Sequence, residues 1–255
     1  MFGGALRTVK ALCLAGAALL ASGIPAAALN VQPVVLDLLS SGRRSSAVVT
    51  LQNTFTTTVP VELVARSVEL IDGEFRETEE ESEDLMVFPA TATVEPGQSQ
   101  AFRVQWVGDP APSASRHYYV SVAQLPVQLP ENENAVQVLY NFKVLVSVGA
   151  NGAKSALSVA SAAIETDKEG RVFPVIHVRN SGDTYGYVGR GRLTVIQRDN
   201  GGAVIFRQAF EPDEIQRRMG LGLIPSGATR RLPINLDLPS AGGSIEVDIA
   251  PVEGR

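Results

Sequence analysis

Cysteine is almost absent from this chain of 255 residues, which contains only Cys13. That residue lies in an apolar stretch, Ala11 to Ser22, which follows the basic residues Arg7 and Lys10 and precedes a run of three alanines. This order is typical of an export signal, and the stretch is too short to serve as a membrane anchor, the alternative interpretation. We therefore expect residues 1–28 to be a cleaved signal peptide and the remaining chain to contain no cysteine.

A chain without cysteine cannot depend on disulfides, thiolate nucleophiles or cysteine-based zinc sites, so its fold must rest on hydrophobic cores. Histidine is also scarce: only His117 and His177 occur, each on an expected strand and neither in a catalytic motif. No serine lies in a nucleophile elbow, and no pair of carboxylates stands in an aromatic setting. We predict a binding protein with no catalytic residue, cofactor or metal site. A hydrolase built on a β scaffold is the least favoured alternative.

Positive charge and long apolar runs are both in short supply. The chain has 22 lysines and arginines against 27 aspartates and glutamates, a net charge of −5. After the signal, no apolar run approaches the roughly 18 residues of a membrane span. We expect neither a nucleic-acid partner nor membrane insertion. The acidic run Glu69 to Asp84 lacks the ligand pattern of an EF-hand, so a solvated hairpin end is favoured over calcium binding.

Alternation of apolar and polar residues with a period of two dominates the sequence. The segments are five to ten residues long, rich in Val, Thr, Tyr and Phe, and bounded by Gly, Pro, Asn or Ser. The clearest are Ala47–Asn53, Val59–Val68, Phe102–Val107, Tyr119–Ala123 and Val136–Tyr140. Short strands at this spacing predict an all-β sandwich or barrel. Only Glu211 to Met219 has helix punctuation, and we expect one short helical turn there.

A faint internal repeat divides the chain. A strand ends at Asn53 and another at Asn180, and each is followed by a Pro/Gly turn, which reaches Gly97 44 residues after Asn53 and begins at Pro225 45 residues after Asn180. Two similar sandwiches in tandem would produce this spacing. The most linker-like stretch begins at Gly149, which predicts domains at 29–149 and 150–255.

Four further segments stand in a fixed order: Val31–Leu38 with the strand ending at Asn53, Val87–Val104, Tyr118–Pro126, and the alternating strand Val136–Val148. In this order they resemble the PapD-like periplasmic chaperones that assemble pili. The likeness covers residues 30 to 148 well and is weaker over 153 to 255. It implies two immunoglobulin-like β-sandwiches and a chaperone that binds pilin-like subunits.

The resemblance also implies a mechanism, in which the chaperone lends a strand to a subunit that lacks its last one. Here that strand would be Val136–Val148, with Val136, Val138 and Tyr140 on one face to fill the subunit's apolar groove. The alternative is a central strand with one face in its own core.

The family's grip on the subunit's C-terminal carboxylate uses an Arg and a Lys, and this sequence departs from both. Val34 and Val35 stand where the Arg is expected, and Leu145 where the Lys is expected. Lys143, two residues away on the same strand face, is the candidate substitute, with Arg43 and Arg44 in the following turn as further candidates. Gly149 likewise replaces a basic residue of the family's interdomain ion pairs, which predicts that those pairs are missing.

The resemblance places the protein in the periplasm. It implies pilin-like subunits as partners, delivery to an outer-membrane usher, and self-capping as a dimer when the chaperone is empty. A structural or surface-scaffold protein built on the same sandwiches is the alternative from a different functional class.

Overall fold

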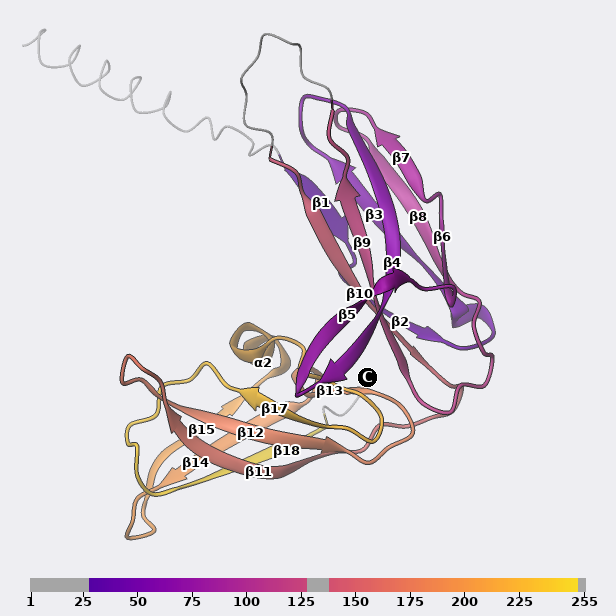
Figure 1. Ribbon diagram of the computed structural model, residues 1–255. Coiled ribbons are helices and arrows are strands. Elements are labelled where there is room, and N and C mark those ends of the chain that lie inside the picture. The colour runs from indigo at the N-terminus through magenta and orange to yellow at the C-terminus, as the bar shows by residue number, and fades with distance from the viewer. Residues whose placement is uncertain (1–27, 128–137, 252–255) are drawn as a thin grey trace, which may run out of the picture.

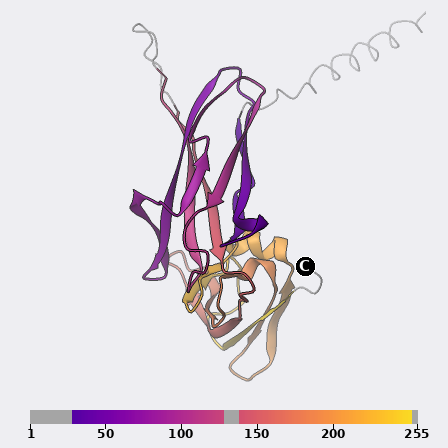
Figure 2. The ribbon, with the colours of Figure 1, turned by 90° about the vertical axis from the view of Figure 1, so that its right-hand side faces the viewer.

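The computed structural model describes residues 28–127 and 138–251. The strands form two layered units, one from each half of the chain, set at an angle to each other (Figure 1). Viewed from the side, the two layers of the N-terminal unit stand above the C-terminal unit (Figure 2). The predicted all-β fold of two immunoglobulin-like sandwiches in tandem is confirmed.

The N-terminal sandwich packs a four-stranded sheet against a six-stranded one. The first has the order β1 (Leu29–Gln32), β3 (Ser46–Asn53), β8 (Ser99–Trp106), β6 (Leu85–Phe88). The second has the order β2 (Val35–Leu39), β10 (Asn141–Gly149), β9 (Arg116–Gln124), β4 (Val59–Ile71), β5 (Glu74–Glu81), with β7 (Thr91–Val94) beside β4. Period-two alternation sends one side chain in two inward, so that Val49, Phe102, Val120 and Val144 are fully buried between the sheets.

The chain changes sheets between β1 and β2. β1 pairs antiparallel with β3, whereas β2 pairs parallel with β10 in the opposite layer. The change falls at Pro33, which has no backbone N–H and so cannot continue the ladder with β3. As a result, within residues 28–127 and 138–251 the first residues of β10 have no strand on their β2 side.

The C-terminal sandwich is smaller. One sheet has the order β11 (Leu157–Thr166), β12 (Val172–Asn180), β17 (Thr229–Pro233). The other has the order β15 (Val204–Phe210), β14 (Arg192–Arg198), β18 (Ser244–Ala250). The short strands β13 (Gly186–Tyr187) and β16 (Leu223–Ile224) pair with each other. A second core, centred on Ile176, Val195 and Phe210, fills the space between the layers. The boundary at residues 149 and 150 lies between the two cores and stays a prediction.

The helix predicted at Glu211 to Met219 is confirmed as α2 (Pro212–Met219). Glu211 and Glu214 form a capping box, a proline occupies the first turn, and Arg217 and Arg218 lie in the last turn. Each of these features stabilises a helix end. Two short 3₁₀ turns complete the elements, η2 (Arg43–Ser45) and η3 (Val188–Arg190).

The sequence repeat has a structural basis in two buried asparagines. The Asn53 Nδ2 group donates to the carbonyls of Thr57 (2.9 Å) and Val94 (2.9 Å). The Asn180 Nδ2 group donates to the carbonyls of Thr184 (2.7 Å) and Ile224 (3.1 Å) in the same way. In both sandwiches, therefore, an asparagine at the end of a strand joins the loop that follows it to the segment before the Pro/Gly turn.

The structure differs from the sequence prediction in the limit of one strand and agrees with it on the acidic run. The strand predicted from Val136 begins only at Asn141, and residues 1–27 and Val136 lie outside the described part of the chain. The acidic run forms the β4–β5 hairpin, whose strand β5 is largely exposed. Across residues 28–127 and 138–251, no group of three or more His, Cys, Asp or Glu could hold a metal ion. No helix in these two ranges has the length and apolarity to cross a membrane.

Candidate subunit-binding edge

The N-terminal half of β10 is an open sheet edge. On one side β10 pairs with β9 along Asn141–Val148. On the other side its pairing with β2 starts only at Leu145, whose N–H donates to the carbonyl of Val34 (3.0 Å). In the described part of the chain, no strand pairs with residues 141–144 on that side. Unpaired backbone groups of this kind are a template for a strand from another chain.

Val138 and Tyr140 extend this edge beyond the end of β10. Both lie before the first strand residue, and the exposed fractions of Val138, Leu139 and Tyr140 are 66%, 45% and 39%. Tyr140 continues the pairing of β10 with β9, because its carbonyl accepts a hydrogen bond from the Gln124 N–H (2.8 Å). Exposure of consecutive apolar side chains beside an open edge is unusual in a folded protein and marks an interaction surface.

Tyr140 belongs to an aromatic cluster at the open end of the sandwich. Its ring stacks on Phe142 with centroids 6.2 Å apart and is tilted against Phe55 with centroids 5.7 Å apart. In an extended strand every second residue lies on the same face, so Tyr140 and Phe142 lie on the face of Val144 and Val146, which point into the core. Val138 is a further member of this alternating set. An extended chain through residues 138–144 would therefore place Val138, Tyr140 and Phe142 on one face, at the open end of the core.

Lys143 lies on the opposite, outward face of β10. Its Nζ forms an ion pair with the Glu77 carboxylate of β5 and lies 5.5 Å from the centre of the Tyr119 ring. The lysine side chain is still 47% exposed. The candidate anchor is therefore accessible, but in this structure a carboxylate of its own chain already contacts it.

Arg43 and Arg44 are not brought next to Lys143. Both are in η2, after the end of β2 that pairs with Gly149. Lys143 precedes Gly149 by six residues, about 20 Å at the rise of a strand. The structure thus separates the two candidate anchors along the same sheet.

The two domains are joined by an ion pair that does not involve position 149. Arg190 of the C-terminal sandwich pairs with Asp37 of β2 at 2.5 Å, and the Tyr185 hydroxyl donates to the other oxygen of Asp37 (2.9 Å). Gly149 lies at a close approach of the two domains, because a Cβ atom at this position would lie 2.5 Å from the Thr184 Oγ1 atom. No basic side chain fits at this approach of the two domains, and the ion pair is formed by other residues.

A second interdomain contact surrounds His117, which the sequence places on a strand without any functional signal. The ring is buried, with Nδ1 3.0 Å from the Ser147 Oγ and Nε2 3.3 Å from the Ser115 Oγ. Tyr187 of the C-terminal sandwich donates to the same Ser147 Oγ (3.0 Å). Burial without a nearby charge lowers the pKa of His117 to about 4. The neutral histidine is therefore part of the contact that holds the domains at their angle.

Comparison with known proteins places this geometry in a family. A family model for pili and flagellar-assembly chaperones, PapD N-terminal domain, matches residues 30–147. No curated protein matches the chain.

Among solved structures, the chain is similar to the chaperone–tip subunit pre-assembly complex of Acinetobacter baumannii Csu pili, with 13% identity, a TM-score of 0.52, and coverage of 89% of this chain and 100% of that one. It is also similar to the Salmonella enterica SafA pilin–SafB chaperone complex, with 15% identity, a TM-score of 0.51, and coverage of 89% and 91%. A third similar structure is the chaperone CfaA of class 5 fimbriae, with 12% identity, a TM-score of 0.51, and coverage of 86% of this chain and 98% of that one. At these identities the likeness shows a shared two-domain fold. The N-terminal sandwich of this chain therefore matches the N-terminal domain of the PapD-like pili and flagellar-assembly chaperones.

Proposed function

We propose that this protein is a periplasmic chaperone that holds pilin-like subunits by lending them the edge that runs from Val138 into β10. The observation that carries the proposal is the open edge at residues 141–144, continued by the exposed side chains of Val138 and Tyr140. Two solved relatives in fold are complexes of a chaperone with a pilin or a tip subunit. Export by residues 1–28, an outer-membrane usher and a self-capped dimer belong to the same proposal and stay predictions.

Strand lending divides affinity and specificity between two kinds of contact. Backbone N–H and C=O groups of residues 141–144 would pair with the subunit's open strand. Val138 and Tyr140, together with Val136 if the strand extends that far, would enter its apolar groove. Transfer of a valine side chain from water into such a groove contributes about 1.5 to 3 kcal/mol. Val138 is mostly exposed in the free protein, so its burial in the subunit would contribute this free energy to binding.

Val138→Asp is expected to abolish subunit capture while leaving the fold intact. A carboxylate at this exposed position is solvated in the free chaperone. In the complex it would enter an apolar groove at a cost of several kcal/mol, which weakens binding by about 100-fold or more. The measurement is a pull-down of the tagged protein from the periplasm, with mass spectrometry of the co-eluting subunit and its stoichiometry.

Leu139→Asp is the matched control, because Leu139 is also exposed but points to the other side of an extended strand. It should retain the subunit. Equal capture by both variants would contradict strand lending through Val138. A wild-type protein that brings down no sandwich-type subunit would favour the surface-scaffold alternative.

We also propose that Lys143 is the anchor for the subunit's C-terminal carboxylate and that Glu77 occupies it in the free protein. Glu77→Gln should then strengthen subunit binding by about two- to fivefold, and Lys143→Gln should weaken it by a similar factor, the range of a half-exposed ion pair. Isothermal titration with a purified subunit measures both. Glu80→Gln, on the exposed part of β5, is the control. Weaker binding by Glu77→Gln would show that the carboxylate does not compete with the subunit.

A further inference from the structure

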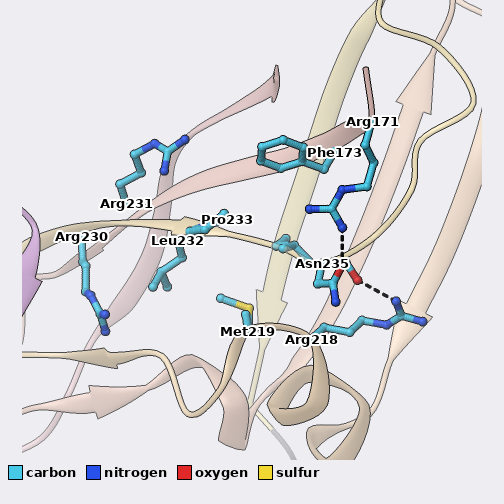
Figure 3. Close-up of a pocket in the computed structure, with 10 residues that line it drawn as sticks. Arg171, Phe173, Arg218, Met219, Arg230, Arg231, Leu232, Pro233 and Asn235 are labelled. Carbon is cyan, nitrogen blue, oxygen red and sulfur yellow. Dashed lines mark hydrogen bonds between the residues drawn. The ribbon is translucent and has the colours of Figure 1, made fainter. Parts of the chain in front are cut away.

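Four arginines line one side of the C-terminal sandwich, and one of them, Arg230, reaches the Phe75 ring of β5 in the N-terminal sandwich. Arg171 precedes β12, and Arg218 lies in the last turn of α2. Arg230 and Arg231 are neighbours on β17 and point to opposite faces of that strand. They line a groove of about 380 Å³. Figure 3 shows Arg230 and Arg231 at one end of the groove and Arg171 and Arg218 at the other. We call it the arginine groove.

The guanidinium groups are held in place by aromatic rings and by one asparagine. Arg171 lies over the Phe173 ring (5.3 Å) and Arg218 over the Phe210 ring (4.8 Å). Both also donate to Asn235, to its side-chain oxygen (2.6 Å) and its backbone carbonyl (2.8 Å), respectively. Arginines fixed by stacking lose little conformational entropy when they bind an anion, and their planar groups match a carboxylate in a bidentate manner.

The positive charge of the groove is only partly balanced. Arg171 pairs with Asp167 at 3.1 Å and Arg231 with Glu165 at 2.5 Å. No carboxylate of residues 28–127 or 138–251 forms an ion pair with Arg218 or Arg230. Arg230 lies over the Phe75 ring and donates to the Leu223 carbonyl (3.1 Å), but its buried Nε atom has no hydrogen-bond partner in the described structure. Two fixed cations without counter-charges favour an anionic ligand.

The rest of the groove suits a peptide better than a free anion. Between its charged ends the wall is apolar, formed by Phe173, Met219, Leu232 and Pro233. β17 is an edge strand of its sheet, so its outer backbone groups are open to an extended chain. With its net charge of −5, the protein as a whole repels polyanions such as nucleic acid and anionic membranes. A short ligand with two separated carboxylates contacts only the positive groove and is little affected by the negative charge of the rest of the protein.

We propose that the arginine groove binds a short acidic peptide segment of a partner protein, with carboxylates at its two ends and apolar side chains between them. The groove lies on the other domain from the subunit-binding edge, and its Arg230 end contacts Phe75 of β5. A chaperone with both sites engages two protein chains at once, one through β10 and one through β17.

The probe is a blocked, fluorescently labelled pentapeptide of alternating Asp and Val, compared with the same peptide carrying Asn in place of Asp. In an NMR titration of the wild-type protein, the acidic peptide should shift backbone amides of β17, of the end of α2 and of the start of β12, and the Asn peptide should not. This mapping needs no variant. Shifts confined to other surfaces, or no shifts, would overturn the proposal.

Fluorescence anisotropy then measures affinity for Arg218→Gln/Arg230→Gln against the control Arg103→Gln/Arg207→Gln, whose arginines are exposed and lie outside the groove. The groove variant should bind the acidic peptide at least about tenfold more weakly, and the control should match wild type. Val138→Asp should also match wild type. Equal affinity of the groove variant, or binding of phosphatidylglycerol vesicles in place of the peptide, would contradict an acidic-peptide site.

Discussion

Replacing Asn180 by alanine is expected to lower the free energy of unfolding of the C-terminal sandwich by about 3 to 5 kcal/mol. Its side chain makes four hydrogen bonds: two donated to the Thr184 and Ile224 carbonyls and two accepted from the Ala156 (3.0 Å) and Gly182 (3.0 Å) N–H groups. Asn180 itself is fully buried. Alanine would leave these backbone groups without partners and water would reach them poorly, at about 1 to 3 kcal/mol for each group that stays unsatisfied.

The chain allows the effect to be assigned to one domain, because its single tryptophan, Trp106, lies in the N-terminal sandwich. Denaturant unfolding followed by circular dichroism reports on both domains, and tryptophan fluorescence reports on the first. In Asn180→Ala the C-terminal sandwich should unfold at a lower denaturant concentration than the N-terminal one. The midpoint measured by circular dichroism should therefore shift more than the midpoint measured by fluorescence. Asn200→Ala, in an exposed turn, should change stability by less than about 0.5 kcal/mol. A loss below 1 kcal/mol at Asn180 would mean that the loop rearranges to satisfy its own backbone.

The importance of this asparagine could be anticipated from sequence because the pattern occurs twice. Asn53 and Asn180 stand at similar distances from Pro/Gly turns, and both are buried and bridge two segments. Strands were equally predictable, since inward residues such as Val49 and Val120 alternate with polar ones. The helix α2 was found from its capping residues alone. These features are local, and each depends on residues close together in the chain or on a repeated spacing.

What the sequence could not provide depends on contacts between distant segments. The Asp37–Arg190 ion pair joins residues 153 positions apart, and Gly149 allows a close approach that no local pattern reveals. β10 begins later than its alternation suggests because its pairing with the distant strand β9 starts only at Asn141. The arginine groove combines residues from three segments and was not predicted. Placement of Lys143 beside Glu77 required the fold of the acidic hairpin.

His117 leads to the second large expected effect, a loss of stability in mild acid. Its surroundings come from four elements: Ser147 on β10, Ser115 before β9, Phe75 on β5 and Tyr185 of the C-terminal sandwich. None of these residues is a carboxylate that could offset a positive charge on the ring. Burial therefore lowers the pKa of His117 to about 4, against an ordinary value of 6.5.

The direction of the effect follows from proton uptake. The unfolded chain binds a proton at this histidine below pH 6.5, whereas the folded protein does so only near pH 4. The stabilisation by the neutral ring is therefore complete above pH 6.5, declines as the pH falls, and is reduced by about 3 kcal/mol at pH 4. The stability advantage of wild type over His117→Gln should shrink by this amount between pH 7.5 and 4, because carboxylate titrations are common to both proteins. An advantage that does not change with pH would show that His117 titrates normally. Because Tyr187 reaches the same Ser147 hydroxyl, protonation should also loosen the domain angle, measurable as a larger radius of gyration by solution scattering.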